Sequence, residues 1–165
     1  PFPPDPAQGG GGGVCPVTCS PAGSYSIVLE TSGSQTVCAG CGGFISFATV
    51  QHNRGFTVTA PATQVTIPKS GLWAINTNLS IPSPFTCVAY TSRWQIRRGA
   101  CGCSTDAERS TYWAVPLSGV GPTGSLAVTR AYDSGDILGV HALSTVAATP
   151  FASGRFSLTL LGESC

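Results

Sequence analysis

Eight cysteines are the residues of this chain with the clearest capacity for chemistry. Cys15 and Cys19 form one closely spaced pair, and Cys38 and Cys41 form another. Tetrahedral zinc needs two such pairs brought together, so these four thiols fit a zinc site. The remaining cysteines are scattered: Cys87, Cys101, Cys103 and Cys165. Since an even number of cysteines suits disulfides on secreted proteins and virion surfaces, we expect disulfides for all of them, with zinc as the alternative.

Two histidines and a pair of aspartates are the other candidates. His52 and His141 have no ligand or catalytic partner nearby in the sequence. His141 lies in GVHAL, where we expect a hydrogen-bonded structural residue on a strand. Asp133 and Asp136 could bind calcium through their oxygens, but in YDSGD we expect them to shape a turn in which Gly135 takes a positive φ.

Arginines flank a tryptophan in the segment SRWQIRRG. Arg93, Arg97 and Arg98 could bind phosphate or glycan, but a solvated strand face with Trp94 buried behind it is the interpretation we favour. The chain has no Gly-x-Ser-x-Gly elbow, phosphate loop or His-Glu metal motif. We therefore expect no catalysis and no cofactor.

The composition limits the partners of the chain. Its 165 residues suit one domain with an arm, and 42% are hydrophobic but only 9% charged. Seven acidic residues oppose eight basic ones, so no strong field attracts nucleic acid or an anionic membrane. No apolar run approaches the roughly 18 to 20 residues that span a bilayer. Such a surface suits a protein that packs against other proteins.

Three regions follow from the local composition. Residues 1–14 are rich in Pro and Gly and predict a flexible arm that reaches a neighbouring subunit. Residues 15–43 form a Cys-rich segment in which TSG could close a hairpin between SYSIVLE and SQTV. We place the folded domain at residues 44–165. The chain contains no Met, which fits either a removed secretion signal or a removed initiator Met, and the second origin fits a virion surface protein.

Alternation of apolar and polar residues, with Gly, Pro, Ser and Asp clusters between segments, predicts strands rather than helices. The longest alternating run is GLWAINTNLSIP, in which one side carries Trp73, Ile75, Thr77, Leu79 and Ile81. We expect strands over residues 24–30, 34–37, 44–50, 62–68, 71–82, 90–99, 110–117, 124–132, 135–143 and 154–162. About eight or more short strands with such turns predict an all-β sandwich or jelly roll.

Five segments, taken in order, resemble the jelly-roll superfamily typified by tumour necrosis factor and the globular head of the complement recognition protein. They are FISFATV, VTIPKSGLWAINTNLSI, SRWQIRRG, LAVTRAYDSGDILGVHAL and FASGRFSLTLLGES. The matching positions include Pro68, Gly71, Trp73, Gly135, Asp136, Phe151, Gly154, Phe156 and Leu158. The resemblance covers residues 44–163 and implies a compact homotrimer without catalytic machinery. The same fold resembles that of trimeric decoration proteins on tailed-phage capsids.

Apolar residues crowd the closing segment of the chain, and Leu160 and Leu161 fall on opposite faces of the expected strand. One face fills the sandwich core, and a neighbouring subunit is the simplest cover for the other. We expect the trimer interface to include Trp73, Phe151, Phe156, Leu158 and Leu160.

These expectations predict a structural virion protein, namely a homotrimeric decoration or cement protein on the exterior of a bacteriophage capsid. Its partners would be itself and the major capsid protein. The alternative is a secreted, trimeric recognition or adhesion head that binds glycan or protein at its loop tips.

Overall fold

The computed structural model describes residues 21–37, 43–80, 90–98, 107–115, 123–144 and 149–164. Every regular element within these ranges is a β-strand. In chain order the strands are β1 (Ser26–Val37), β2 (Gly43–Phe44), β3 (Thr49–Arg54), β4 (Val65–Thr66), β5 (Gly71–Ser80), β6 (Tyr90–Arg98), β7 (Ala107–Val115), β8 (Thr123–Tyr132), β9 (Ile137–Ser144) and β10 (Thr149–Glu163). No helix among the described residues has the length and apolar character needed to cross a membrane.

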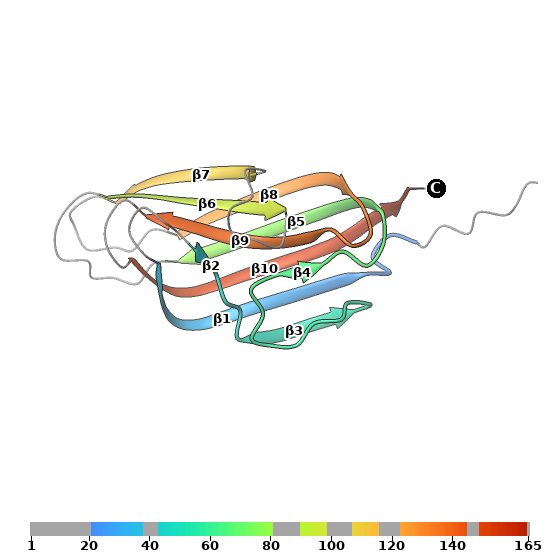
Figure 1. The fold of residues 1–165 in the computed structure, drawn as a ribbon, viewed down its shortest axis with the longest axis horizontal. Coiled ribbons are helices and arrows are strands. Elements are labelled where there is room, and N and C mark those ends of the chain that lie inside the picture. The colour runs from blue at the N-terminus through green and yellow to red at the C-terminus, as the bar shows by residue number, and fades with distance from the viewer. Residues whose placement is uncertain are drawn as a thin grey trace, which may run out of the picture.

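Two antiparallel sheets face each other (Figure 1). In the described part of the chain, one sheet has the order β3-β1-β10-β5-β8, and the other has the order β2-β9-β6-β7 with β4 also paired to β9. Neighbouring strands within each sheet are mostly distant in sequence, and all of the pairings run antiparallel. The predicted fold class, a jelly-roll β-sandwich, is confirmed.

Strand β5 shows why the sequence forms these sheets. Its predicted inward residues Trp73, Ile75 and Leu79 are completely buried, and Thr77 between them is 2% exposed. The residues between these positions point away from the core, as the period of two in a β-strand requires. Ile81 lies outside the described residues.

The core lies between the two sheets and is closed by aromatic contacts. The rings of Phe47 and Phe156 stack with centroids 5.6 Å apart, and Phe56 meets Trp73 edge to face at 5.7 Å. The indole Nε1 of Trp73 donates a hydrogen bond to the carbonyl oxygen of Lys69 at 3.1 Å, so the buried indole is satisfied. Each fully buried large apolar side chain stabilises the fold by about 1.5–3 kcal/mol.

Residues 24–37 do not form the predicted hairpin. They include the single strand β1, which lies between β3 and β10 near the middle of its sheet. The pairing of β1 with β10 shifts register between Ser32 and Gln35, and Gly33 has a φ of 108° there. The TSG residues, which have the composition of a turn, therefore form an irregularity within β1 and do not reverse the chain. The predicted domain boundary at residue 44 is wrong for the same reason, because Ile27 and Leu29 belong to the core.

The side chain of Gln35 joins β1 to the segment that enters β3. Its Oε1 accepts a hydrogen bond from the backbone N–H of Ser46 at 2.7 Å, and its Nε2 donates to the carbonyl oxygen of Ser46. The same Nε2 donates to Thr31 Oγ1 at 2.8 Å. These bonds hold the chain where Ile45 and Phe47 enter the core.

The turn predicted at YDSGD is confirmed. The backbone N–H of Asp133 donates to Asp136 Oδ2 at 2.8 Å, and the N–H of Asp136 donates to the carbonyl oxygen of Asp133 at 3.0 Å. Gly135 has a φ of 93°, which favours glycine. The turn is anchored on the chain before β5, since Ser134 Oγ donates to the carbonyl oxygen of Pro68 at 3.1 Å.

Gly71 pairs with Glu163 of β10, and the backbone of β10 leaves no room there for a side chain. A Cβ at Gly71 would lie 2.4 Å from the carbonyl oxygen of Gly162 and 3.0 Å from Glu163 Cα. Because these are backbone atoms, they cannot rotate away. We expect Gly71→Ala to lower the free energy of unfolding by about 1–3 kcal/mol, measured as a lower urea midpoint with an unchanged slope.

Gly43→Ala is the matched control, because Gly43 also lies on a strand and a Cβ there would meet no atom within 4 Å. We expect its free energy of unfolding to stay within about 0.5 kcal/mol of the original value. Equal losses in the two variants would contradict a steric origin.

Candidate functional site

The sheet formed by β1, β10, β5 and β8 turns its second face away from the core. We call this surface the outer face. Its residues are the half-buried or exposed positions that alternate with the core residues: Val28, Glu30, Leu72, Ala74, Asn76, Asn78, Ser125, Ala127, Thr129, Ala131, Ser153, Arg155, Ser157, Thr159 and Leu161. Of these residues, only Glu30 and Arg155 are charged.

Strand register arranges the outer face in rows that cross the four strands. One row consists of Glu30, Arg155, Asn78 and Ser125. The adjacent row consists of Val28, Ser157, Asn76 and Ala127. Most of these side chains are small or uncharged, so burial of the centre of the face against another molecule would remove few charged groups from water.

One end of the outer face is apolar. Leu72 is 44% exposed and Leu161 is 43% exposed, and they are the large hydrophobic residues that the described part of the chain leaves most open to solvent. The pairing of β10 with β5 shifts register between Leu160 and Gly162, which places Leu161 beside Leu72. Ala131 pairs with Leu72 from the other side. Neighbouring large exposed leucines are typical of a surface that another protein covers.

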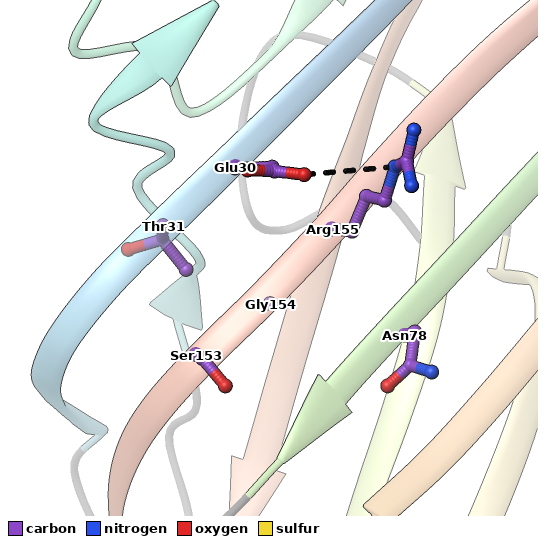
Figure 2. Close-up of a pocket in the computed structure, with 6 residues that line it drawn as sticks. All are labelled: Glu30, Thr31, Asn78, Ser153, Gly154 and Arg155. Atoms are coloured by element: carbon purple, nitrogen blue, oxygen red, sulfur yellow. Dashed lines mark ion pairs between the residues drawn. The ribbon is translucent and has the colours of Figure 1, made fainter. Parts of the chain in front are cut away.

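The other end is polar and hollowed. Figure 2 shows Glu30 and Arg155 facing each other across β1 and β10, with Arg155 Nε 3.8 Å from Glu30 Oε1. The hollow beside them has a volume of about 270 Å³ and is lined by Glu30, Thr31, Asn78, Ser153, Gly154 and Arg155. The two charged side chains are 39% and 60% exposed, so water screens their attraction.

A second hollow of about 280 Å³ continues from the first toward β8. Asn78 and Arg155 line both of them, and Asn76, Ser157 and Ser125 are added. The middle of the outer face is therefore a shallow trough of amide and hydroxyl groups. A flat surface of another molecule would not fill it, but projecting side chains would.

Strand β3 adds a polar rim to this face. The register places His52 opposite Val28 and Arg54 opposite Ser26. The Ser26 hydroxyl and His52 Nε2 share a hydrogen bond at 2.7 Å. Exposed polar groups thus border a centre that is poor in charge, which is the anatomy of a protein interface.

The predicted interface residues lie elsewhere. Trp73, Phe156, Leu158 and Leu160 are at most 1% exposed in a single chain, because the second sheet covers them. Their side chains therefore have no surface left for a second chain, and the interface prediction is wrong for these four residues. The side chain of Phe151 lies outside the described part of the structure. The expectation that Leu160 and Leu161 face opposite sides is confirmed.

The cysteine predictions and the predicted arm fall on residues that the structure does not describe. These are the cysteines at positions 15, 19, 38, 41, 87, 101, 103 and 165, together with residues 1–14. Among the residues it does describe, no group of three or more His, Cys, Asp or Glu side chains could hold a metal ion. Both histidines are described: His141 is 3% exposed on β9 and meets the Phe44 ring edge to face at 5.4 Å, whereas His52 is exposed on β3.

Large apolar residues do not mark the outer face, so the apolar pattern of the sequence does not predict it. The sequence feature that marks the outer face is the polar residues between the apolar ones. Asn76, Asn78 and Ser157 alternate with core residues, and the strands that carry them have few charged residues on that side. Strand pairing was needed to show that these positions gather on one surface.

Comparison with known proteins identifies the fold. No family model and no curated protein sequence matches the chain. Among solved structures, murine APRIL at pH 5.0 is 15% identical with a TM-score of 0.60, over 82% of this chain and 99% of that one. Eiger TNF from S. frugiperda is 12% identical with a TM-score of 0.63, over 88% and 96% of the two chains.

The globular domain of zebrafish complement 1qA protein is 10% identical with a TM-score of 0.59, over 85% of this chain and 99% of that one. These similarities extend along almost the whole of each solved domain. The chain therefore has the jelly-roll fold shared by tumour necrosis factor ligands and the globular domain of complement 1q.

Proposed function

We propose that the chain is a non-catalytic structural protein that assembles through its outer face into a homotrimer. The observation that carries this proposal is the chemistry of that face, which has a centre poor in charge, a polar rim and two neighbouring exposed leucines, Leu72 and Leu161. Depletion of charge at the centre of a surface is what distinguishes protein interfaces from other surfaces. The number of copies rests on the fold, because the tumour necrosis factor and complement-head resemblance implies homotrimers.

The trimer serves as a decoration or cement protein on the exterior of a virion, with the major capsid protein as its partner. The low charged fraction of 9% supports this role, since such a surface suits permanent contact with other proteins. Gly23 and Tyr25 hydrogen-bond to Leu160 at 2.7 and 3.0 Å, so the described chain enters the sandwich at the end that carries Leu161.

In this role the arm and the body act together. The outer face joins the copies, and residues 1–14 reach from the trimer to a neighbouring capsid subunit. Disulfides among the eight cysteines would strengthen the clamp by restricting the unfolded chain, at about 2–4 kcal/mol for each bridge.

An extracellular recognition or adhesion head is the second candidate. The likeness to murine APRIL, Eiger TNF and the complement 1qA globular domain favours it. Such a head would use the same trimer but bind glycan or protein at its loop tips instead of a capsid. The two candidates differ in the partner, and not in the assembly.

Substitution of the exposed leucines tests the assembly. We expect Leu72→Glu and Leu161→Glu each to raise the protein concentration at which half of the trimer dissociates by about tenfold or more, because each places a charge in the apolar part of the interface. Sedimentation equilibrium measures this concentration.

Leu72→Met and Leu161→Met are the matched controls, since they keep an apolar side chain of similar volume. We expect both to assemble as the original chain does. A protein that sediments as a monomer at every concentration, or Glu variants that assemble normally, would refute assembly through this face.

Co-purification separates the two functional candidates. For a decoration protein we expect the chain to sediment with intact capsids, in fixed proportion to the major shell protein, through repeated density gradients. Recovery of the protein only in the capsid-free fraction, together with binding to a glycan array, would favour the recognition head.

A further inference from the structure

We infer that Glu30 and Arg155 set the register of the assembly by pairing between copies, with Arg155 of one chain reaching Glu30 of the next. This inference rests on the proposed assembly through the outer face and adds the partner that each charged group selects. The occupant of the polar hollow is then a second copy of this chain.

The pair within one chain is incomplete. Arg155 lies directly opposite Glu30 on the paired strands, yet its Nε is 3.8 Å from Glu30 Oε1, beyond the length of a good hydrogen bond. A guanidinium carries five N–H donors in a planar fork. Figure 2 shows that only the Nε side of Arg155 is turned toward Glu30. Among the described residues, the ion pair with Glu30 is the one that Arg155 forms, and it involves only Nε. Most of the N–H donors of Arg155 therefore remain available for a second carboxylate.

The space beside the pair is suited to an incoming side chain. The hollow of about 270 Å³ is bordered by the small residues Thr31, Ser153 and Gly154. A Cβ at Gly154 would lie on the core side of the strand, 2.2 Å from Leu79 Cδ2, so it would not occupy the hollow. Protein interfaces reach the packing density of protein interiors, so in the assembly this space must be occupied. An arginine stem and fork from a neighbouring copy would fill it.

The two charged residues of the outer face indicate which side chain of a neighbouring copy enters the hollow. Glu30 and Arg155 are the charged residues of the outer face, and burial of either one without a partner would be costly. Around a threefold axis the two sides of each interface are unlike, so away from the axis a residue on one copy contacts a different residue on the next. Juxtaposition of Arg155 with Glu30 satisfies both charges at every interface, whereas arginine against arginine would repel.

The test uses charge reversal in the full chain. We expect Glu30→Arg and Arg155→Glu each to raise the concentration for half dissociation of the trimer by about tenfold or more. Both side chains are more than a third exposed, so each variant should fold, and its urea midpoint checks that it does. The two variants are then mixed in equal amounts. In a trimer that contains both variants, residues 155 and 30 carry opposite charges at every interface between unlike chains. Only the one interface between identical chains stays repulsive.

Native mass spectrometry distinguishes the mixed trimers by mass. The expected result is that, at a concentration at which the original chain is trimeric and each variant by itself is dissociated, the mixture forms trimers containing both chains. Charge reversal leaves the pair within each chain repulsive in this mixture, so only pairing between copies can explain the rescue. The double variant Glu30→Arg/Arg155→Glu should assemble as the original chain does.

Two outcomes would overturn the inference while leaving the proposed assembly intact. In one, the original chain is trimeric and both single variants assemble equally well. In the other, the double variant assembles but the mixture of single variants does not, which would assign the pair to stability within one chain. If the original chain is itself monomeric, the proposed assembly fails, and the inference fails with it.

Discussion

Strand β10 carries the constraint on which the rest of the structure depends. It pairs with β1 on one side and with β5 on the other along most of its length. This double pairing fixes which residues of all three strands face inward. A slip of one residue would turn Arg155 and Ser157 toward the core and Phe156 and Leu158 toward the outer face. The core would then contain polar side chains, and the outer face would expose large apolar ones. The same register that buries the aromatic contacts also gathers the polar trough on the opposite side.

Local patterns in the sequence predicted the parts of the fold that depend on local physics. The alternation of Trp73, Ile75 and Leu79 identified β5 and its buried side, because the period of two is visible without knowledge of the neighbours. The turn between Asp133 and Asp136 was predictable for a similar reason, since its side-chain bonds span only a few residues. Five segments in order were enough to suggest the jelly roll that the solved structures show.

Non-local pairing explains what the sequence did not predict. The TSG residues after Glu30 have the composition of a hairpin turn, and only the partner strand β10 keeps the chain extended through them. The interface assignment failed for a related reason. Trp73 and Phe156 are apolar enough for an interface or a core, and the choice depends on the second sheet that covers them. A single sequence shows that a face is apolar, but it does not show what lies against it.

The double pairing of β10 also bears on how the chain is made. β10 is the last strand of the described chain, and it lies between two strands that are synthesised long before it. Until the ribosome has passed Glu163, β1 and β5 have no neighbour between them, so their facing edges are open. The rate of folding must then reflect the slow closure of a long loop. A chain interrupted before β10 therefore lacks the strand that joins β1 to β5 and cannot form the outer face.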